Sequence, residues 1–376
     1  MLTVTEKDEY EVMKAKKAIV ISARVHPGEV VGSWMMRGVL FFLTDPDNAE
    51  AKMLRDKFIF KIIPMLNPDG VINGNYRCSL AGCDLNRRWK TPHKNIHPTI
   101  FYTKKLIREL HNERGVMLYC DLHGHSRKQN VFMYGCNNKQ KPEECRVFPL
   151  ILSKLSKYFH FGSCRFGVQK SKESTARITV YKELRTCPNI FTMESTFSGL
   201  DIGDMKGQHM VPEHFEQMGT DLCRTLLIYN NIYIPPELES LYGSKDKNST
   251  GDVSSMFANE LKSDKKLLAA GDGDSSGGSD SEPSEDNLPV DEVAKVVPIV
   301  DKQQKIQLQK IQKRKALEEK EGEKRPPKKK VEESPTRSPI PRQRSPVKKT
   351  DILQVKPVEE KKDSKKKPEM KDACTQ

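Results

Sequence analysis

The chain has 376 residues, a formal net charge of +13 at pH 7 and a mean hydropathy of −0.66. No stretch reaches the roughly 18 consecutive apolar residues of a membrane-spanning helix, and the N-terminus lacks the apolar core of a signal peptide. The nine cysteines form no CxxC pair and no regular spacing, which indicates free thiols in a reducing compartment. We therefore expect a soluble, intracellular protein.

The composition divides the chain near residue 242. Residues 1–242 hold nearly all the aromatic side chains and are long enough to bury a core. Residues 243–376 consist mainly of Lys, Glu, Asp, Ser and Pro, and such a segment is too polar to offset its chain entropy by burial. We predict a globular domain over 1–242, then a disordered acidic linker and a basic tail rich in Lys, Pro and Ser. Both parts carry an excess of Lys and Arg, so acidic partners are expected for each.

Apolar patterns within residues 1–242 alternate between strands and helices. The expected strands are short runs rich in β-branched or aromatic residues, at 18–22, 58–66, 116–122, 131–134, 165–169 and 189–193. The expected helices have apolar residues at helical spacing, at 33–43, 99–114 and 212–229. Strands separated by helices favour an α/β fold whose open, mixed and mostly parallel sheet is flanked by helices.

Side chains that bind metals follow two of these strands. His26 and Glu29 lie three residues apart in the turn after the first expected strand, and His123 follows a buried apolar run. Two histidines and a glutamate that leave a fourth position for water are typical of a catalytic zinc site. In open α/β sheets ligands bind beyond the carboxyl ends of the strands, where these three residues would meet. The sequence therefore predicts one Zn²⁺ in this domain.

Hydrolysis at such an ion would also require a proton acceptor. Bound zinc lowers the pKa of water to about 7 and polarises a carbonyl oxygen. Glu194 ends an otherwise apolar strand, and a carboxylate in that place is costly to bury without a role. We predict that Glu194 is the general base and later the proton donor for the leaving amine. The alternative is a glutamate paired with Lys or Arg for structural reasons.

Arginines after the second expected strand would supply positive charge for a substrate. A guanidinium binds a planar carboxylate bidentately, so Asn86 with Arg87 suits a free α-carboxylate and hence an exopeptidase. Arg77 would lie where an oxyanion develops, although any single arginine is more often a solvated surface residue. Asp84 could orient a zinc-bound histidine through its second nitrogen. The alternative role of Asp84 is to cap its own turn.

These residues, in this order, resemble those of the M14 zinc carboxypeptidases. Longer strings resemble the cytosolic carboxypeptidase branch of that family over roughly residues 17–230, namely SARVHPGE, PMLNPDGVINGNYRCSLAGCDLNRRW, YCDLHGHSRKQNVFMYGC, QKSKESTAR and FTMEST. The resemblance implies a zinc carboxypeptidase-like fold. It implies that the zinc ligands are His26, Glu29 and His123, that the base is Glu194, and that the residue polarising the scissile carbonyl is Arg77. It further implies that the terminal carboxylate binds Asn86 and Arg87, and that Asp84 supports the first zinc histidine.

The cytosolic branch removes glutamates from protein C-termini and from side-chain polyglutamate, above all on tubulin. The resemblance thus implies a cytosolic protein deglutamylase whose partners are polyglutamylated tubulin, microtubules or other glutamate-rich tails, and neither a membrane nor a nucleic acid. Arg177 falls near the floor of the family's specificity pocket, where a cation suits a glutamate side chain. Lys170 and Lys172 are candidates for the rim of that pocket.

Two other functions stay open. Members of the branch usually carry a β-sandwich domain before the catalytic domain, and catalytic elements that would precede Met1, so the chain is expected to be an N-terminally truncated form. In one alternative this form is catalytically weak or inert and its basic tail binds microtubules or another acidic partner. Residues 324–330 of that tail also suit a nuclear-import signal. In the other alternative the chain is a zinc amidohydrolase of small N-acyl amino acids, which shares the same plan of site residues.

Overall fold

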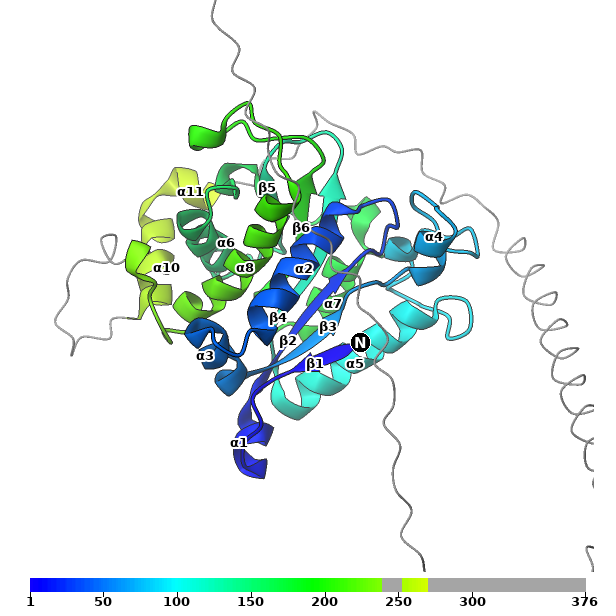
Figure 1. The fold of residues 1–376 in the computed structure, drawn as a ribbon, viewed down its shortest axis with the longest axis horizontal. Coiled ribbons are helices and arrows are strands. Elements are labelled where there is room, and N and C mark those ends of the chain that lie inside the picture. Colours follow the sequence, from blue (N-terminus) through cyan, green and yellow to red (C-terminus); the bar gives the residue numbers. More distant parts are fainter. Residues whose placement is uncertain (239–251, 270–376) are drawn as a thin grey trace, which may run out of the picture. The chain divides into compact units, whose positions relative to one another are not determined.

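The computed structural model describes residues 1–238 and 252–269, which are arranged around a central sheet (Figure 1). Its strands are β1 (Leu2–Val4), β2 (Lys17–Ala23), β3 (Phe58–Ile63), β4 (Val116–His125), β5 (Val131–Tyr134) and β6 (Ile190–Thr196). They are ordered β1-β3-β2-β4-β6-β5. The four central strands run parallel, and the edge strands β1 and β5 are antiparallel to their neighbours. The predicted α/β fold with an open, mixed and mostly parallel sheet is therefore confirmed.

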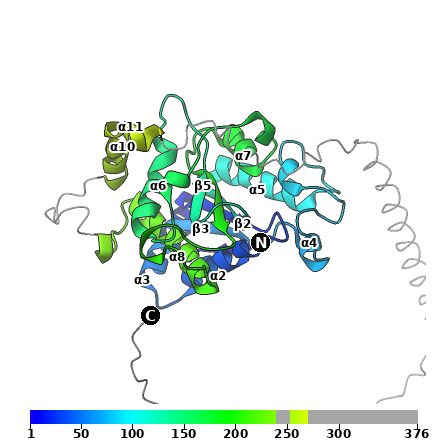
Figure 2. The same ribbon diagram turned by 90° about the horizontal axis from the view of Figure 1, so that it is seen from above.

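Helices cover both faces of this sheet (Figure 2). One face carries α2 (Val31–Thr44), α3 (Ala49–Lys57) and α8 (Pro212–Tyr229), and the other carries α5 (Pro98–Arg114) and α7 (Ala176–Leu184). Successive side chains of a strand point to opposite faces. Ile19 and Ile21 of β2 accordingly belong to the core cluster of α2 and α8, whereas Ala18 and Val20 belong to that of α5 and α7. Burial on both faces explains why the central strands are apolar almost throughout.

The remaining elements are short or lie at the margins of the sheet. The helices are α1 (Tyr10–Ala15), α4 (Pro68–Ile72), α6 (Glu144–Leu155), α10 (Val253–Ser263) and α11 (Lys265–Ala269). Single 3-10 turns lie at Leu85–Arg87, Phe161–Ser163, Lys170–Lys172 and Gly203–Met205. Within residues 1–238 and 252–269, no helix combines the length and the apolar composition needed to cross a membrane.

The predicted strand over residues 165–169 is wrong. Arg165 forms only an isolated bridge with Tyr134, and the chain then leaves the sheet. Phe166 is fully buried, and its ring packs so close to Gly135 that a Cβ there would lie 2.6 Å away. This segment therefore forms a few backbone hydrogen bonds to residues 133–137 without becoming a strand, and it contributes the side chain of Phe166 to the core.

The predicted boundary at residue 242 also needs correction, because α10 follows it and packs against α6 and α8. Val253, Phe257 and Leu261 are buried at a spacing of four residues, which places them on one stripe of the helix. Asn231 ties the start of α10 to the end of α8, since its Oδ1 accepts from the backbone N of Val253 at 2.8 Å. Three apolar residues in a polar stretch barely change the average composition, so composition did not predict this helix. The rest of the expected linker and tail lies outside the described residues.

Candidate metal centre and active site

The turn after β2 is held in place by backbone and side-chain contacts. Arg24, with a φ of 56°, donates from Nε and Nη2 to the carbonyl oxygen of Pro27 at 3.0 and 2.6 Å. Its Nη1 donates to Ser33 Oγ at 2.6 Å and so joins the turn to α2. Gly28 N donates to Tyr76 O at 2.7 Å, and a Cβ at Gly28 would lie 2.5 Å from the Tyr76 ring. Only glycine allows the backbone at position 28 to come this close to Tyr76. This contact holds the residues on either side of Gly28 in place.

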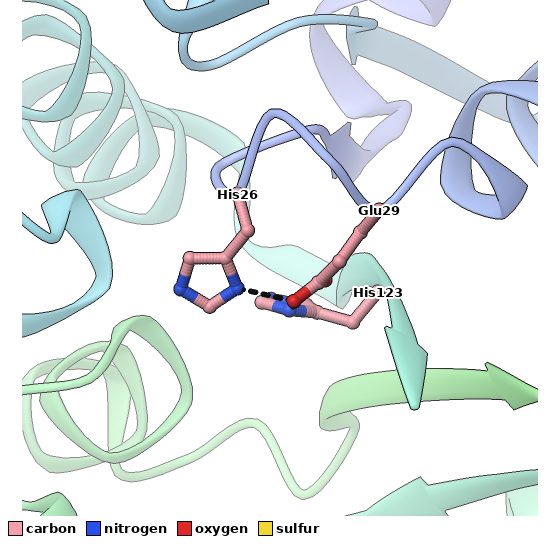
Figure 3. A group of neighbouring side chains, drawn as sticks. All are labelled: His26, Glu29 and His123. Carbon is pink, nitrogen blue, oxygen red and sulfur yellow. Dashed lines mark hydrogen bonds and ion pairs between the residues drawn. The ribbon is translucent and has the colours of Figure 1, made fainter. Parts of the chain in front are cut away.

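His26, Glu29 and His123 converge from this turn and from the carboxyl end of β4 (Figure 3). One ligand atom from each lies within 4.8 Å of the others, and all three residues are buried. Glu29 Oε1 lies 2.6 Å from His26 Nδ1, and Glu29 Oε2 lies 2.9 Å from His123 Nδ1. The two segments meet because β2 and β4 are parallel neighbours in the sheet. Two imidazole nitrogens and a carboxylate are the donor set of a zinc ion with an open fourth position.

The surroundings of these three residues favour a cation. Burial alone would lower the pKa of His123, but the carboxylates of Asp121 and Glu29 outweigh it and raise that pKa well above its usual value. For His26, burial is likewise outweighed, by Glu29 and Asp84, so its pKa is also raised. Burial would raise the pKa of Glu29, yet the two histidines hold it far below the usual range. The residues present therefore fit a divalent metal ion in both donor type and charge.

Asp84 contacts four of the other predicted site residues. Its Oδ1 lies 3.1 Å from His26 Nε2, on the side of the ring away from Glu29, and accepts from the backbone N of Asn86 at 2.8 Å. Its Oδ2 accepts from Arg77 Nε at 2.9 Å and lies 3.9 Å from Arg87 Nη1. Asp84 thus caps the 3-10 turn at Leu85–Arg87 and also contacts His26, and the support of a metal-bound histidine stays a prediction. Burial would raise its pKa, but His26, Arg77 and Arg87 lower it strongly.

A tight hairpin sets Arg77 and Asp84 side by side. Gly82 N donates to Ser79 O, and Ser79 N donates to Cys83 O, each at 2.9 Å. Gly82 has a φ of +70°, a left-handed conformation that closes the turn with a one-residue bulge. The chain therefore returns on itself within a few residues, and the Arg77 side chain can reach the Asp84 carboxylate.

Asn86 connects this loop to α7, which carries Arg177. The Asn86 Oδ1 accepts from the backbone N of Ala176 at 2.9 Å, one residue before Arg177. Arg177 is 8% exposed, and its Nη1 donates to the carbonyl oxygen of Gly135 and to Cys136 Sγ, the latter at 3.4 Å. The predicted carboxylate clamp and the predicted specificity residue are therefore neighbours. Lys170 and Lys172 lie in the 3-10 turn just before α7.

Glu194 lies on the same face of the sheet as His123. The two are directly paired between β6 and β4, and Glu194 also pairs with Phe132 of β5. Paired residues of adjacent strands point to the same face and lie about 5 Å apart. The predicted base is therefore next to a predicted metal ligand without belonging to the cluster of metal ligands. Its catalytic role stays a prediction.

Asp121 is a site residue that the sequence analysis missed. It is 0% exposed, and its Oδ2 lies 2.9 Å from His123 Nε2. Its Oδ1 accepts from Ser22 Oγ at 2.8 Å, and Ser22 Oγ lies 3.2 Å from Tyr119 Oη. The period of two along β4 carried the signal, because it places an acid and the histidine two residues later on one face. A carboxylate on the far nitrogen of a ligating histidine fixes its tautomer and orientation.

We expect Asp121→Asn to weaken zinc binding by 10- to 100-fold, because a neutral amide supports the imidazole of His123 less well. Competition with a chromophoric chelator would measure the affinity, and the thermal unfolding midpoint would show that the variant folds. Asp8→Asn, at an exposed position, is the matched control. A folded Asp121→Asn variant with unchanged zinc affinity would contradict this role.

Comparisons with known proteins agree with the fold. The zinc carboxypeptidase family model matches residues 1–160. Cytosolic carboxypeptidase 2 of Xenopus tropicalis is 52% identical over 234 residues, which cover 61% of this chain and 24% of that protein. Cytosolic carboxypeptidase 2 of Danio rerio is 53% identical over 218 residues, which cover 57% of this chain and 30% of that protein. The chain therefore spans 24% to 30% of the length of these curated relatives.

Solved carboxypeptidases share the fold. A metallo-carboxypeptidase from Burkholderia cenocepacia aligns with a TM-score of 0.52 at 24% identity, over 60% of this chain and 59% of its own. One from Pseudomonas aeruginosa, solved in complex with (2-guanidinoethylmercapto)succinic acid, aligns with a TM-score of 0.52 at 25% identity, over 61% of this chain and 60% of its own. Residues 1–160 therefore form a domain of the M14 zinc carboxypeptidase family, and the chain is similar to the cytosolic carboxypeptidases, with about half of the aligned residues identical.

Proposed function

We propose that this chain is a zinc metallocarboxypeptidase that removes glutamates from acidic protein tails such as those of polyglutamylated tubulin. The observation that carries the proposal is the buried cluster of His26, Glu29 and His123, with Glu194 paired to His123 across the sheet. The relatives' name, cytosolic carboxypeptidase, supports an exopeptidase that acts in the cytosol. Association with microtubules would follow from the substrate.

The chain's own residues supply most of the expected chemistry. When bound, Zn²⁺ would polarise the scissile carbonyl and acidify a water molecule. Glu194 would accept the proton of the attacking water and deliver it to the leaving amine. Arg77, whose Nε is held by Asp84, would stabilise the negative charge that develops on the carbonyl oxygen. Because this guanidinium is already held in place, little free energy would be spent on reorienting it as the negative charge develops.

Selectivity for a chain terminus would come from the loop that follows the hairpin. Asn86 and Arg87 would bind the α-carboxylate of the last residue, and a substrate without that group would lack this contact. Asn86 is fixed by its bond to Ala176 N, so the clamp is oriented before a substrate arrives. Arg177, buried beside it, would pair with the side-chain carboxylate of a terminal glutamate.

We expect Arg177→Gln to lower kcat/KM for a Glu-ended peptide about 10- to 100-fold relative to a Phe-ended one, because a hydrogen bond to a charged group contributes about 1.5–3 kcal/mol. Arg177→Lys should retain part of the preference, since it keeps the charge but loses the planar fork. Amino-acid release from the two peptides would measure the ratio. Equal cleavage of both peptides by the unaltered protein would end this assignment.

The activity itself is tested with a synthetic peptide that ends in several glutamates. We expect the zinc-loaded chain to release free glutamate, and a zinc chelator to stop the release. A small N-acyl amino acid in a parallel assay would detect an amidohydrolase instead. Retained microtubule binding by a folded, zinc-loaded chain that releases no glutamate would support the binding alternative and overturn the proposed enzyme.

A further inference from the structure

Two cations flank one aromatic side chain beside the candidate active site. The Arg177 guanidinium lies 5.8 Å from the centre of the Tyr134 ring, and the Lys128 Nζ lies 5.5 Å from the same centre. The Lys128 Nζ is closer still to Phe132, at 4.9 Å from the ring centre. Arg177 comes from α7 and Lys128 from the connection between β4 and β5. Ring faces attract cations, so both head groups have a defined position over β5.

The pairing of the strands places these cations at different levels of the sheet. Phe132 pairs with Glu194, which pairs with His123, so these residues form one row across β5, β6 and β4. Tyr134 belongs to the next row on the same face, together with Thr192. Rows on one face are about 6.6 Å apart along a strand. Lys128 is nearest Phe132 and therefore lies close to the row of the metal ligand and the base.

The backbone of Lys128 is held by the carboxyl end of β4. His125 Nδ1 accepts from the backbone N of Lys128 at 3.0 Å and from that of Arg127 at 3.1 Å. The His125 ring itself packs edge-on against Phe132, with ring centres 5.5 Å apart. His125 is two residues from His123 and so lies on the same face of the sheet. The position of Lys128 is therefore linked to the strand that carries a predicted metal ligand.

The proposed function already supplies partners for both anions of a terminal glutamate. Its α-carboxylate would bind Asn86 and Arg87, and its side chain would bind Arg177. In the proposed function the scissile carbonyl would lie at the row of His123 and Glu194, and the penultimate residue, which carries this carbonyl, would lie there too. Lys128 supplies a third cation near this row. Beside two aromatic rings it is partly removed from water, which strengthens its attraction for a carboxylate.

We propose that Lys128 binds the side-chain carboxylate of the residue that precedes the scissile bond, so that the site recognises two consecutive acidic residues. This inference rests on the proposed carboxypeptidase function and adds a second specificity position to it. The favoured substrates would be tails whose last two residues are both acidic. After each cleavage a run of acidic residues would present the same pair again, until one acidic residue remains.

The test compares peptides that end in Glu-Glu and in Ala-Glu. We expect Lys128→Gln to reduce the ratio of kcat/KM for Glu-Glu to that for Ala-Glu about tenfold, and Lys128→Arg to restore most of it. Lys105→Gln, on the exposed surface of α5, is the matched control. In Lys128→Gln the ratio of kcat/KM for a peptide ending in Glu-Glu to that for one ending in Glu-Phe should equal that of the unaltered protein, because Arg177 is expected to determine the preference for the terminal residue.

A measurement of peptide binding tests the same proposal without depending on catalysis. Calorimetric titration of both peptides into the zinc-loaded chain should show tighter binding of Glu-Glu, and Lys128→Gln should remove that difference. If the chain cleaves neither peptide but binds them in this way, the proposed function fails and the Lys128 site stands. An equal loss for both peptides, or a changed preference for the terminal residue, would overturn the role of Lys128.

Discussion

Glu194→Gln is expected to lower kcat by 10²- to 10⁴-fold, the range that a positioned general base contributes. Gln has nearly the same size as Glu but cannot accept the proton of the attacking water. Glu194 pairs with His123 across the sheet but is not one of the three residues whose ligand atoms cluster. The zinc content and affinity of the variant should therefore equal those of the unaltered protein. KM should change little if Glu194 acts mainly in the transition state.

Metal analysis and peptide hydrolysis on the same preparation would distinguish the loss of a general base from the loss of zinc. Glu109→Gln, at an exposed position on α5, controls for the loss of one negative charge. A zinc-loaded Glu194→Gln variant with normal kcat would remove Glu194 from the mechanism. A variant that loses both zinc and activity would instead make Glu194 part of the metal site, contrary to its placement here.

The sequence predicted much of the fold because the strongest patterns are periodic and local. The bounds of α8 and β5 match the expected 212–229 and 131–134, where a long amphipathic stretch and a compact apolar run leave little ambiguity. α6 was missed because Pro149 lies inside it and proline weakens any helical signal. α7 was missed although it carries Arg177, since its apolar residues form no clear stripe among Arg, Thr and Lys.

The candidate site was predictable as a list of residues but not as a geometry. Strand-end positions suggested that His26 and His123 meet, yet only the order of the sheet makes their strands neighbours. The contacts of Asp84 with both a metal ligand and Arg77 depend on the bulged hairpin, which no single residue type signals. Asp121 could have been found from the alternation along β4. Lys128 could not, because its position depends on rings from β5 and on the imidazole of His125.

Glu29→Gln should have the opposite signature to Glu194→Gln, namely loss of the metal itself. Glu29 lies between the two histidines, contacts an Nδ1 atom of each, and accepts from Gly124 N at 2.9 Å through Oε2. The two histidines hold the pKa of its carboxyl far below the usual range, against the effect of burial. Gln removes that charge and turns an amide group toward a histidine nitrogen. We expect zinc to be absent after dialysis and peptide hydrolysis to fall to background.

The stability of the protein gives a second measurement of this loss that does not depend on activity. A ligand that binds only the folded chain stabilises it by about 4 kcal/mol at a thousand times its Kd. Added zinc should therefore raise the thermal unfolding midpoint of the unaltered protein and of Glu194→Gln by similar amounts, but leave that of Glu29→Gln unchanged. An equal zinc-dependent shift in Glu29→Gln would mean that the two histidines hold the ion without Glu29. Glu194 pairs with His123 across the sheet, whereas Glu29 lies in the turn after β2, and these two isosteric amides would assign each carboxylate to its own part of the site.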